Sequence, residues 1–76
     1  MDDILYSVVD TAKLLKISKN KTYELVKAGL LPGIKLGGLK IRKSTIEKFL
    51  ADYEGYDLTD LANIKKLDFE NLKDED

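Results

Sequence analysis

Four structural patterns follow one another between residues 7 and 50, and their order constrains the fold more than any other feature of the chain. Two short segments with helical apolar spacing each begin at a serine, a glycine pair interrupts an alternating segment, and a third helical segment begins at another serine. Serine is a preferred N-cap residue, and a glycine pair favours a tight hairpin turn. The expected elements are therefore two helices, a hairpin and a third helix, at residues 7–15, 18–28, 34–41 and 44–50.

The first two helices are predicted to form a helix-turn-helix. Ser7 precedes side chains spaced at i, i+3, i+4 and i+7, and an acid stands three residues later, where a capping box places it. Ser18 precedes a second stripe that ends at Gly29, a residue suited to the left-handed conformation that terminates a helix. Only Lys16-Ile17 separate the two helices, so we expect a sharp corner between them.

The hairpin is predicted to turn at Gly37-Gly38, because both residues of a primed two-residue turn tolerate positive φ. The cross-strand pairs that follow are Gly33 with Arg42, Ile34 with Ile41, Lys35 with Lys40 and Leu36 with Leu39. This register places four aliphatic side chains on one face and two lysines on the other. Like charges directly opposite destabilise a sheet, so we expect an anion such as phosphate to compensate them.

The third helix is expected to close the core beneath the hairpin. Ser44 is its expected N-cap, and Glu47 completes a capping box. Its inward stripe is predicted to consist of Ile46, Phe49, Leu50 and Tyr53. The whole pattern predicts an α+β, mainly α, winged helix-turn-helix with a two-stranded β-hairpin wing and a C-terminal acidic helical tail.

The formal net charge of −1 conceals an uneven distribution along the chain. Residues 1–53 carry ten Lys or Arg against six Asp or Glu, a net +4, and residues 54–76 carry three against eight, a net −5. We expect a winged helix-turn-helix domain at 1–53 and an acidic, partly helical tail at 54–76. Such asymmetry is typical of a nucleic-acid surface joined to an interaction segment, with ordinary solvated charge as the alternative.

The tail carries apolar residues that predict an amphipathic helix over residues 57–67, and Phe69 and Leu72 extend its stripe weakly. Two interpretations remain open for this stripe. It either packs on the body to thicken a thin core or docks on another protein. Residues 73–76 are expected to fray.

The composition argues against catalysis and metal binding. The chain has no cysteine and no histidine, which removes thiolate sites, the commonest metal ligand and the usual general base. We expect no pocket to shift the pKa values of Asp2 and Asp3 at the terminus. No apolar run approaches the roughly 18 residues of a membrane span, and the acidic start is not a signal peptide. We therefore expect a cytoplasmic protein that is not an enzyme and has no cofactor, metal, membrane or small-molecule substrate.

The outward face of the second helix is the strongest candidate site. Six residues lie off its apolar stripe, namely Lys19, Asn20, Lys21, Tyr23, Glu24 and Lys27. A solvated lysine face is the alternative, which the position in a helix-turn-helix disfavours. The Tyr23 ring is expected either to contact a sugar or phosphate or to cap the core.

Several motifs combine in order along residues 5–50. They are Tyr6-Ser7-Val8, Ala12-Lys13-Leu14-Leu15, Ile17-Ser18-Lys19, Thr22-Tyr23-Glu24-Leu25-Val26-Lys27-Ala28-Gly29, Leu31-Pro32, Leu36-Gly37-Gly38 and Ile41-Arg42-Lys43-Ser44. With them, the chain resembles the excisionase-type branch of the MerR-like winged helix-turn-helix family. Lys16 stands at the corner, where that family often has glycine, and the wing carries Leu39 and Lys40, where an arginine-rich stretch is common.

The resemblance implies a protein that places its second helix in the major groove of double-stranded DNA and its wing on the adjacent backbone or minor groove. Such proteins act as recombination directionality factors, which bend DNA and help an integrase excise a mobile element, or as small transcriptional regulators. The implied partners are double-stranded DNA, an integrase or recombinase, and another copy of the protein on DNA. The matched positions are Lys19, Asn20, Lys21 and Tyr23 on the recognition helix and Lys40 and Arg42 on the wing.

The side-chain chemistry suggests a role for each candidate. The amide of Asn20 can pair with adenine through two hydrogen bonds, and Lys19 or Lys21 can contact guanine. The other basic residues are better suited to phosphates. The complete candidate DNA-binding set is Ser18, Lys19, Asn20, Lys21, Tyr23, Lys27, Lys35, Lys40, Arg42 and Lys43.

Overall fold

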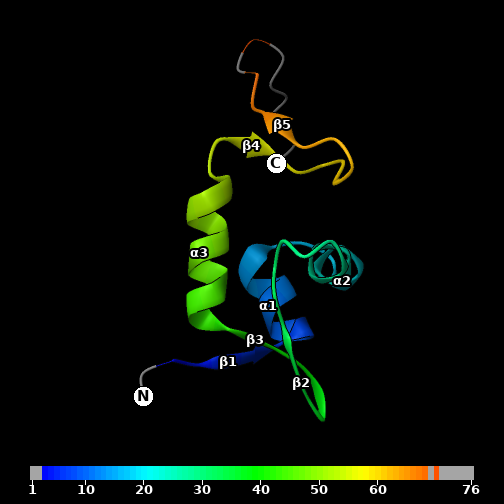
Figure 1. The fold of residues 1–76 in the computed structure, drawn as a ribbon, viewed down its shortest axis with the longest axis vertical. Coiled ribbons are helices and arrows are strands. Elements are labelled where there is room, and N and C mark those ends of the chain that lie inside the picture. The colour runs from blue at the N-terminus through cyan, green and yellow to red at the C-terminus, as the bar shows by residue number, and fades with distance from the viewer. Residues whose placement is uncertain (1–2, 69, 71–76) are drawn as a thin grey trace.

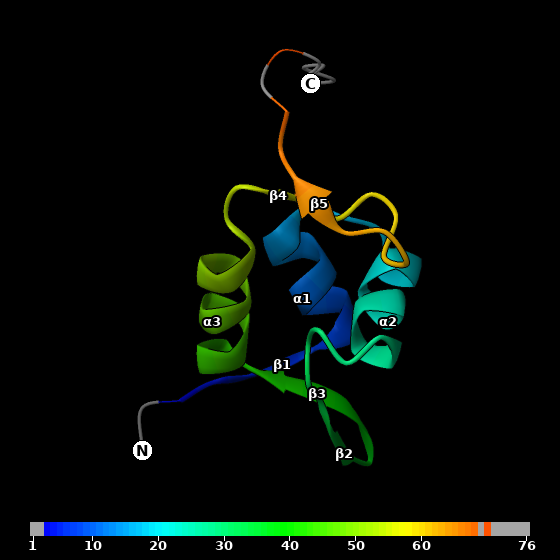
Figure 2. The same ribbon diagram turned by 45° about the horizontal axis from the view of Figure 1, so that its top comes forward.

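The computed structural model of the protein describes residues 3–68 and residue 70 (Figure 1). The helices are α1 (Val8–Leu15), α2 (Lys19–Lys27) and α3 (Lys43–Tyr53), and the strands are β1 (Leu5–Ser7), β2 (Ile34–Leu36), β3 (Gly38–Arg42), β4 (Tyr56–Asp57) and β5 (Lys65–Lys66). In Figures 1 and 2, α1 lies between α2 and α3, and the β2–β3 hairpin projects from the body on the side of α2. The three helices and the small antiparallel sheet are consistent with a winged helix-turn-helix.

Serine caps begin the first two helices, as predicted. Ser7 Oγ accepts the Asp10 N–H at 3.1 Å, and Ser18 Oγ accepts the Lys21 N–H at 3.0 Å. The residue four positions after each cap is a fully buried threonine whose hydroxyl donates to the carbonyl of that serine. The buried hydroxyls of Thr11 and Thr22 are therefore satisfied within their own helices.

The corner and the end of α2 both use left-handed backbone. Lys16 caps α1 at φ 57° and ψ 43°, the conformation that glycine adopts more readily, so the corner is sharp without a glycine. Gly29 follows α2 at φ 80°. Its N–H donates to Val26 O at 3.0 Å and the Leu30 N–H donates to Leu25 O at 3.1 Å, the two bonds of a Schellman motif.

The two-stranded hairpin of β2 and β3 forms as predicted, and an unpredicted third strand, β1, extends its sheet to the order β1-β3-β2. The segment before Ser7 forms β1, which pairs antiparallel with β3 and places Tyr6 opposite Ile41. Central strand β3 is therefore hydrogen-bonded on both sides, and its Ile41 is completely buried.

The predicted hairpin register is wrong by one residue. Only Gly37, at φ 78°, separates the paired Leu36 and Gly38, so the turn is tighter than a glycine–glycine loop. A shift of one residue moves side chains to the opposite face. Lys35 now lies opposite Leu39, and Lys40 lies opposite Ile34. The two lysines therefore do not oppose each other and need no phosphate between them.

Helix α3 is capped from the N-terminus of the chain and not by its own serine. Arg42 occupies the N-cap position without a side-chain cap bond. Asp3 instead accepts the Ser44 N–H at 3.1 Å, the Ser44 hydroxyl at 2.8 Å and the Arg42 Nε–H. The predicted capping box of Ser44 and Glu47 is therefore wrong, because a carboxylate from a distant segment is the stronger acceptor.

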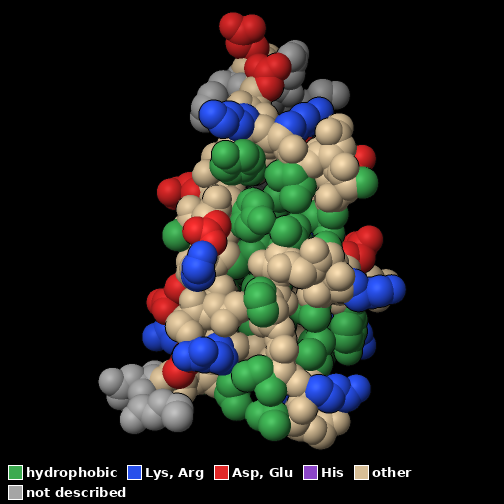
Figure 3. All heavy atoms as spheres, in the orientation of Figure 1, with side chains coloured by type: hydrophobic (Ala, Val, Ile, Leu, Met, Phe, Trp, Pro, Cys, Tyr) green, Lys and Arg blue, Asp and Glu red, His purple; other side chains and the backbone are tan. Residues whose placement is uncertain are grey.

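The core lies between α2, α3 and β3. Its buried members are Leu25, Leu31, Ile41, Ile46 and Phe49, and Tyr53 packs against them with its ring centroid 5.3 Å from that of Phe49. Leu50 is 52% exposed, so its assignment to the inward stripe is wrong. Figure 3 shows hydrophobic side chains along the face between α3 and α2, so this thin core is incompletely covered.

The described part of the tail forms a short hairpin and not a helix, so the helix predicted over residues 57–67 is wrong. Asp57 Oδ1 accepts the Thr59 N–H at 2.9 Å, and Asp60 Oδ1 accepts the Ala62 N–H at 3.0 Å. These local turns compete with helical hydrogen bonding. Leu58 packs against the core, as does Leu61, which supports the interpretation that the tail thickens the core.

The remaining expectations for the tail, the stripe at Phe69 and Leu72 and the fraying of residues 73–76, lie outside the described residues. Within residues 3–68 and 70, no helix has the length and apolar character needed to cross a membrane.

We predict that Gly29→Ala destabilises the protein by about 1 kcal/mol, because an L side chain is strained at φ 80°. Space is not the limiting factor, since no atom lies within 4 Å of an added Cβ. Gly38→Ala is the matched control, because Gly38 has equally open space without positive φ. Urea unfolding of both variants checks this, and equal stabilities would contradict the strain at Gly29.

We also predict an acid-dependent contribution from Asp3. Hydrogen bonds from Arg42 and Ser44 lower the pKa of Asp3 from 3.8 to about 2, which corrects the expectation of an unshifted terminal carboxyl. Because the folded-state pKa is lower than the unfolded one, the charged carboxylate stabilises the fold above about pH 4, and this contribution disappears as the pH falls towards 2. The Tm difference between the parent and Asp3→Asn should therefore shrink across this window. A constant difference from pH 7 to pH 2 would contradict this assignment.

Candidate DNA-binding surface

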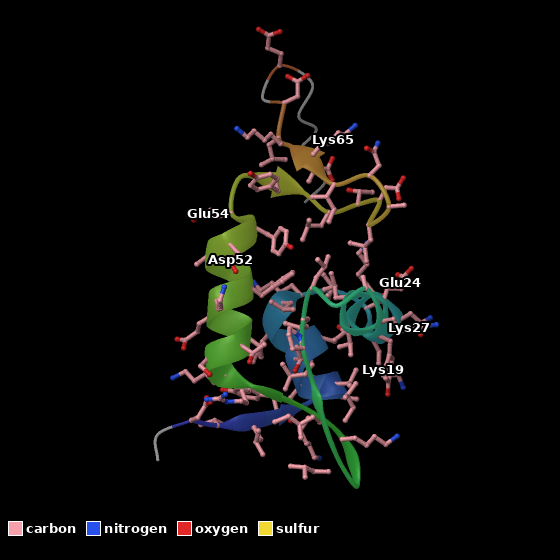
Figure 4. All side chains as sticks on the ribbon, in the orientation of Figure 1. Lys19, Glu24, Lys27, Asp52, Glu54 and Lys65 are labelled. Carbon is pink, nitrogen blue, oxygen red and sulfur yellow. The ribbon has the colours of Figure 1, made fainter. Side chains whose placement is uncertain are left out.

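The outward face of α2 is free of packing by the rest of the described chain. Lys19, Asn20, Tyr23 and Lys27 are all exposed, while Thr22 and Leu25 on the opposite face are buried. Figure 4 shows Lys19, Glu24 and Lys27 pointing to the side of the molecule away from α3. Side chains three and four residues apart share one helix face, so these residues form a single surface, which we call the α2 face.

Tyr23 belongs to the α2 face and not to the core. Its side chain is 43% exposed, and it is not among the residues that pack against the core cluster. Of the two interpretations of its ring, the core cap is therefore contradicted. A phenol at the surface of a helix combines a flat apolar ring with a hydroxyl that donates and accepts hydrogen bonds.

Lys21 does not lie on the α2 face. Its ammonium donates to the carbonyls of Leu58 and Thr59 at 2.9 and 3.1 Å, and its side chain is half-buried under the tail.

Hydrogen bonding by Thr59, helped by the charges of Lys65 and Lys21, lowers the pKa of Asp57 below its ordinary value. The tail therefore brings the Asp57 carboxylate within electrostatic reach of the Lys21 ammonium.

The wing adds two lysines near the α2 face. Lys35 is exposed on β2, and Lys40 is half-buried on β3, on the opposite face of the hairpin. Both views of the fold show the hairpin projecting below α2 (Figures 1 and 2). The arrangement places a helix and a projecting hairpin side by side.

The three remaining candidates lie at the edges of this arrangement. Arg42 pairs with Asp3 and leads into α3, and Lys43 is the first residue of that helix, so both lie at the foot of α3 and not at the tip of the wing. Ser18 is exposed at the start of α2, where its hydroxyl already accepts one N–H bond. The structure therefore brings together part of the predicted site and separates Lys21, Arg42 and Lys43 from it.

Glu24 was predicted to face outward from the second helix, but it was not included in the candidate DNA-binding set. It is exposed and projects beside Lys27 (Figure 4). A carboxylate is repelled by phosphate but accepts a hydrogen bond from the amino group of cytosine in the major groove. The helical spacing of Glu24 from Asn20 and Lys27 already indicated that it shares their face. Among the described residues, no cluster of carboxylates could hold a metal ion.

The helix-turn-helix domain family matches residues 5–53 of this chain. The protein belongs to the helix-turn-helix domain family. The matched segment runs from β1 to the end of α3 and so contains the α2 face and the wing. Membership of this family supports binding to double-stranded DNA. No curated protein and no solved structure matches the chain.

We predict that Asp57→Asn tightens DNA binding by about threefold at low salt, because it removes one negative charge within electrostatic reach of Lys21 on α2. Asparagine retains the side-chain oxygen that accepts the Thr59 N–H, so the local turn is preserved. Fluorescence anisotropy with a labelled duplex measures the effect.

Glu54→Gln is the matched control, because it removes the same charge at the end of α3, across the molecule from α2 (Figure 4). Tightening of equal size in both variants would show a general charge effect and would contradict a local role for Asp57.

Proposed function

We propose that the protein is a sequence-specific double-stranded DNA-binding protein that places α2 in the major groove and the wing on the adjacent backbone or minor groove. The observation that carries this proposal is the exposed α2 face, with Lys19, Asn20, Tyr23 and Lys27 beside a projecting basic hairpin. An α-helix fits the major groove, where base edges present distinct donor and acceptor patterns.

The proposed roles follow from side-chain chemistry. Asn20 pairs with adenine through its amide, Lys19 contacts guanine, and Tyr23 contacts a sugar or phosphate. Lys27, Lys35 and Lys40 bind phosphates, which position the protein without selecting sequence. We assign Ser18, Arg42 and Lys43 to the edge of the interface, where they can approach phosphates. Lys21 reaches DNA only when it is released from the tail carbonyls.

For the biological role, we propose a recombination directionality factor similar to excisionases. This rests on the ordered motifs of residues 5–50 and on the small size of the interface. A single copy makes few phosphate contacts, so tight binding requires several adjacent copies or a partner such as an integrase.

A small transcriptional regulator is the alternative role. An excision reaction reconstituted with a recombinase that acts at the bound site separates the two. Stimulated excision supports the directionality factor. An unchanged excision rate together with an altered promoter output supports the regulator.

A protein-interaction module acting through the tail is less well supported. Its motivation was an apolar stripe on a tail helix, whereas Leu58 and Leu61 pack against the core. We therefore propose that the described part of the tail completes the body, and that the net negative charge of residues 54–76 moderates its DNA affinity.

We predict that Asn20→Ala relaxes the preference for one base pair by about 1–3 kcal/mol, because it removes a bidentate base contact. Lys40→Ala should weaken binding to all sequences alike, because a phosphate contact carries no sequence information. Selection from a random duplex pool, followed by titration against single-base variants of the selected site, measures both effects.

Lys48→Ala is the control for the loss of one positive charge, because Lys48 lies on α3 and pairs with Asp52. Its affinity should stay within about twofold of the parent under the same salt conditions. Uniform loss of affinity from both Asn20→Ala and Lys40→Ala would defeat the assignment of Asn20 to base recognition.

A further inference from the structure

The outer face of the three-stranded sheet carries aliphatic side chains that no part of the described chain covers. The register puts Ile34 and Leu36 on the same face as Lys40, while Ile41 faces the core from the other side. Leu36 is 57% exposed and Ile34 is 41% exposed. Figure 3 shows hydrophobic side chains beside basic ones at this end of the molecule.

The shape of the hairpin isolates Leu36 at its tip. Its cross-strand partner is Gly38, which has no side chain, and its chain neighbour is Gly37 at φ 78°. No atom lies within 4 Å of a Cβ added at either glycine, so the space around the turn is open. The turn is therefore bare backbone, with Leu36 exposed on its outer face and Leu39 half-buried on the other face.

The charges around this tip indicate which partner it fits. Lys40 lies two residues from Gly38 on the face of Leu36, and Lys35 lies on the opposite face. The aliphatic side chain is thus flanked by a cation on each face of the hairpin. A DNA groove has the complementary pattern, with phosphates along both rims and less polar sugars and base edges between them. The minor groove is about 6 Å wide, which suits a hairpin end without bulky neighbours.

We propose that Leu36 is an apolar wedge that enters the minor groove and bends the duplex while α2 occupies the adjacent major groove. This rests on the proposed function, because it requires the duplex to lie against α2 and the wing together. Inserted leucine and isoleucine side chains partly unstack a base step and kink DNA by about 20–90°. Lys35 and Lys40 hold the two phosphate rims, and Ile34 extends the apolar contact behind Leu36.

The test measures binding and bending separately on the full chain. Fluorescence anisotropy gives affinity for a duplex selected from a random pool, and energy transfer between dyes at the two duplex ends gives the bend. Leu36→Ala should reduce the bend by about half or more, with affinity within about tenfold of the parent. Leu36→Met should retain the bend, because it keeps a large apolar side chain.

Leu14→Ala is the matched control, because Leu14 is a similarly exposed leucine (53%) on α1. It should bind and bend DNA as the parent does. Thermal unfolding of each variant confirms that the fold is kept.

An unchanged bend in Leu36→Ala, or an equal loss in Leu14→Ala, would overturn the wedge while leaving DNA binding intact. A parent protein that binds without bending would do the same. If the parent is a dimer in sedimentation and Leu36→Ala is a monomer, the apolar face contacts a second copy and the wedge is likewise overturned. A parent that binds no duplex would overturn the proposed function itself.

Discussion

The pairing of β3 on both of its edges is the constraint on which the rest of the structure depends. Ile41 at the centre of this strand is completely buried and lies opposite Tyr6 of β1. Because β1 runs directly into α1 and β3 runs directly into α3, one short sheet sets the directions of both helices. The bonds from Arg42 and Ser44 to Asp3 then close the same junction from the N-terminal side.

The α2 face owes its exposure to the way in which the opposite face is held. Thr22 and Leu25 are buried, Ser18 caps the first turn, and Gly29 ends the helix in a satisfied motif. Because both ends of α2 are capped and its inner face is buried, its backbone loses little conformational freedom when the α2 face binds a partner. The tail also holds α2 through Lys21, whose ammonium donates to two tail carbonyls, and it places the negative charge of Asp57 within electrostatic reach of that lysine.

Local patterns predicted the helices well because their causes are local. Ser7, Ser18 and Gly29 each act within a few residues, and all three take their predicted roles. The errors arose where the decisive partner is distant in the chain. Asp3 caps a helix that begins 40 positions later, and β1 adds a third strand whose partner is β3.

The same distinction applies to the candidate site. Helical spacing was sufficient to place Lys19, Asn20 and Lys27 on one exposed face. It could not show that Lys21 binds carbonyls 37 and 38 residues away. The predicted register of the wing failed because the hairpin turns at one glycine and not at two. This shift of one residue changes which side chains share a face of the hairpin.

The most direct test of the account is a map of the DNA contact surface by amide chemical-shift changes in the full, isotope-labelled chain. A short duplex of mixed sequence at low salt is sufficient, because non-specific binding is dominated by the same phosphate contacts. We expect changes concentrated in α2 and the β2–β3 hairpin, with small changes in α3 away from its first turn. Changes centred on the exposed faces of α1 and α3, with α2 and the hairpin unaffected, would contradict it.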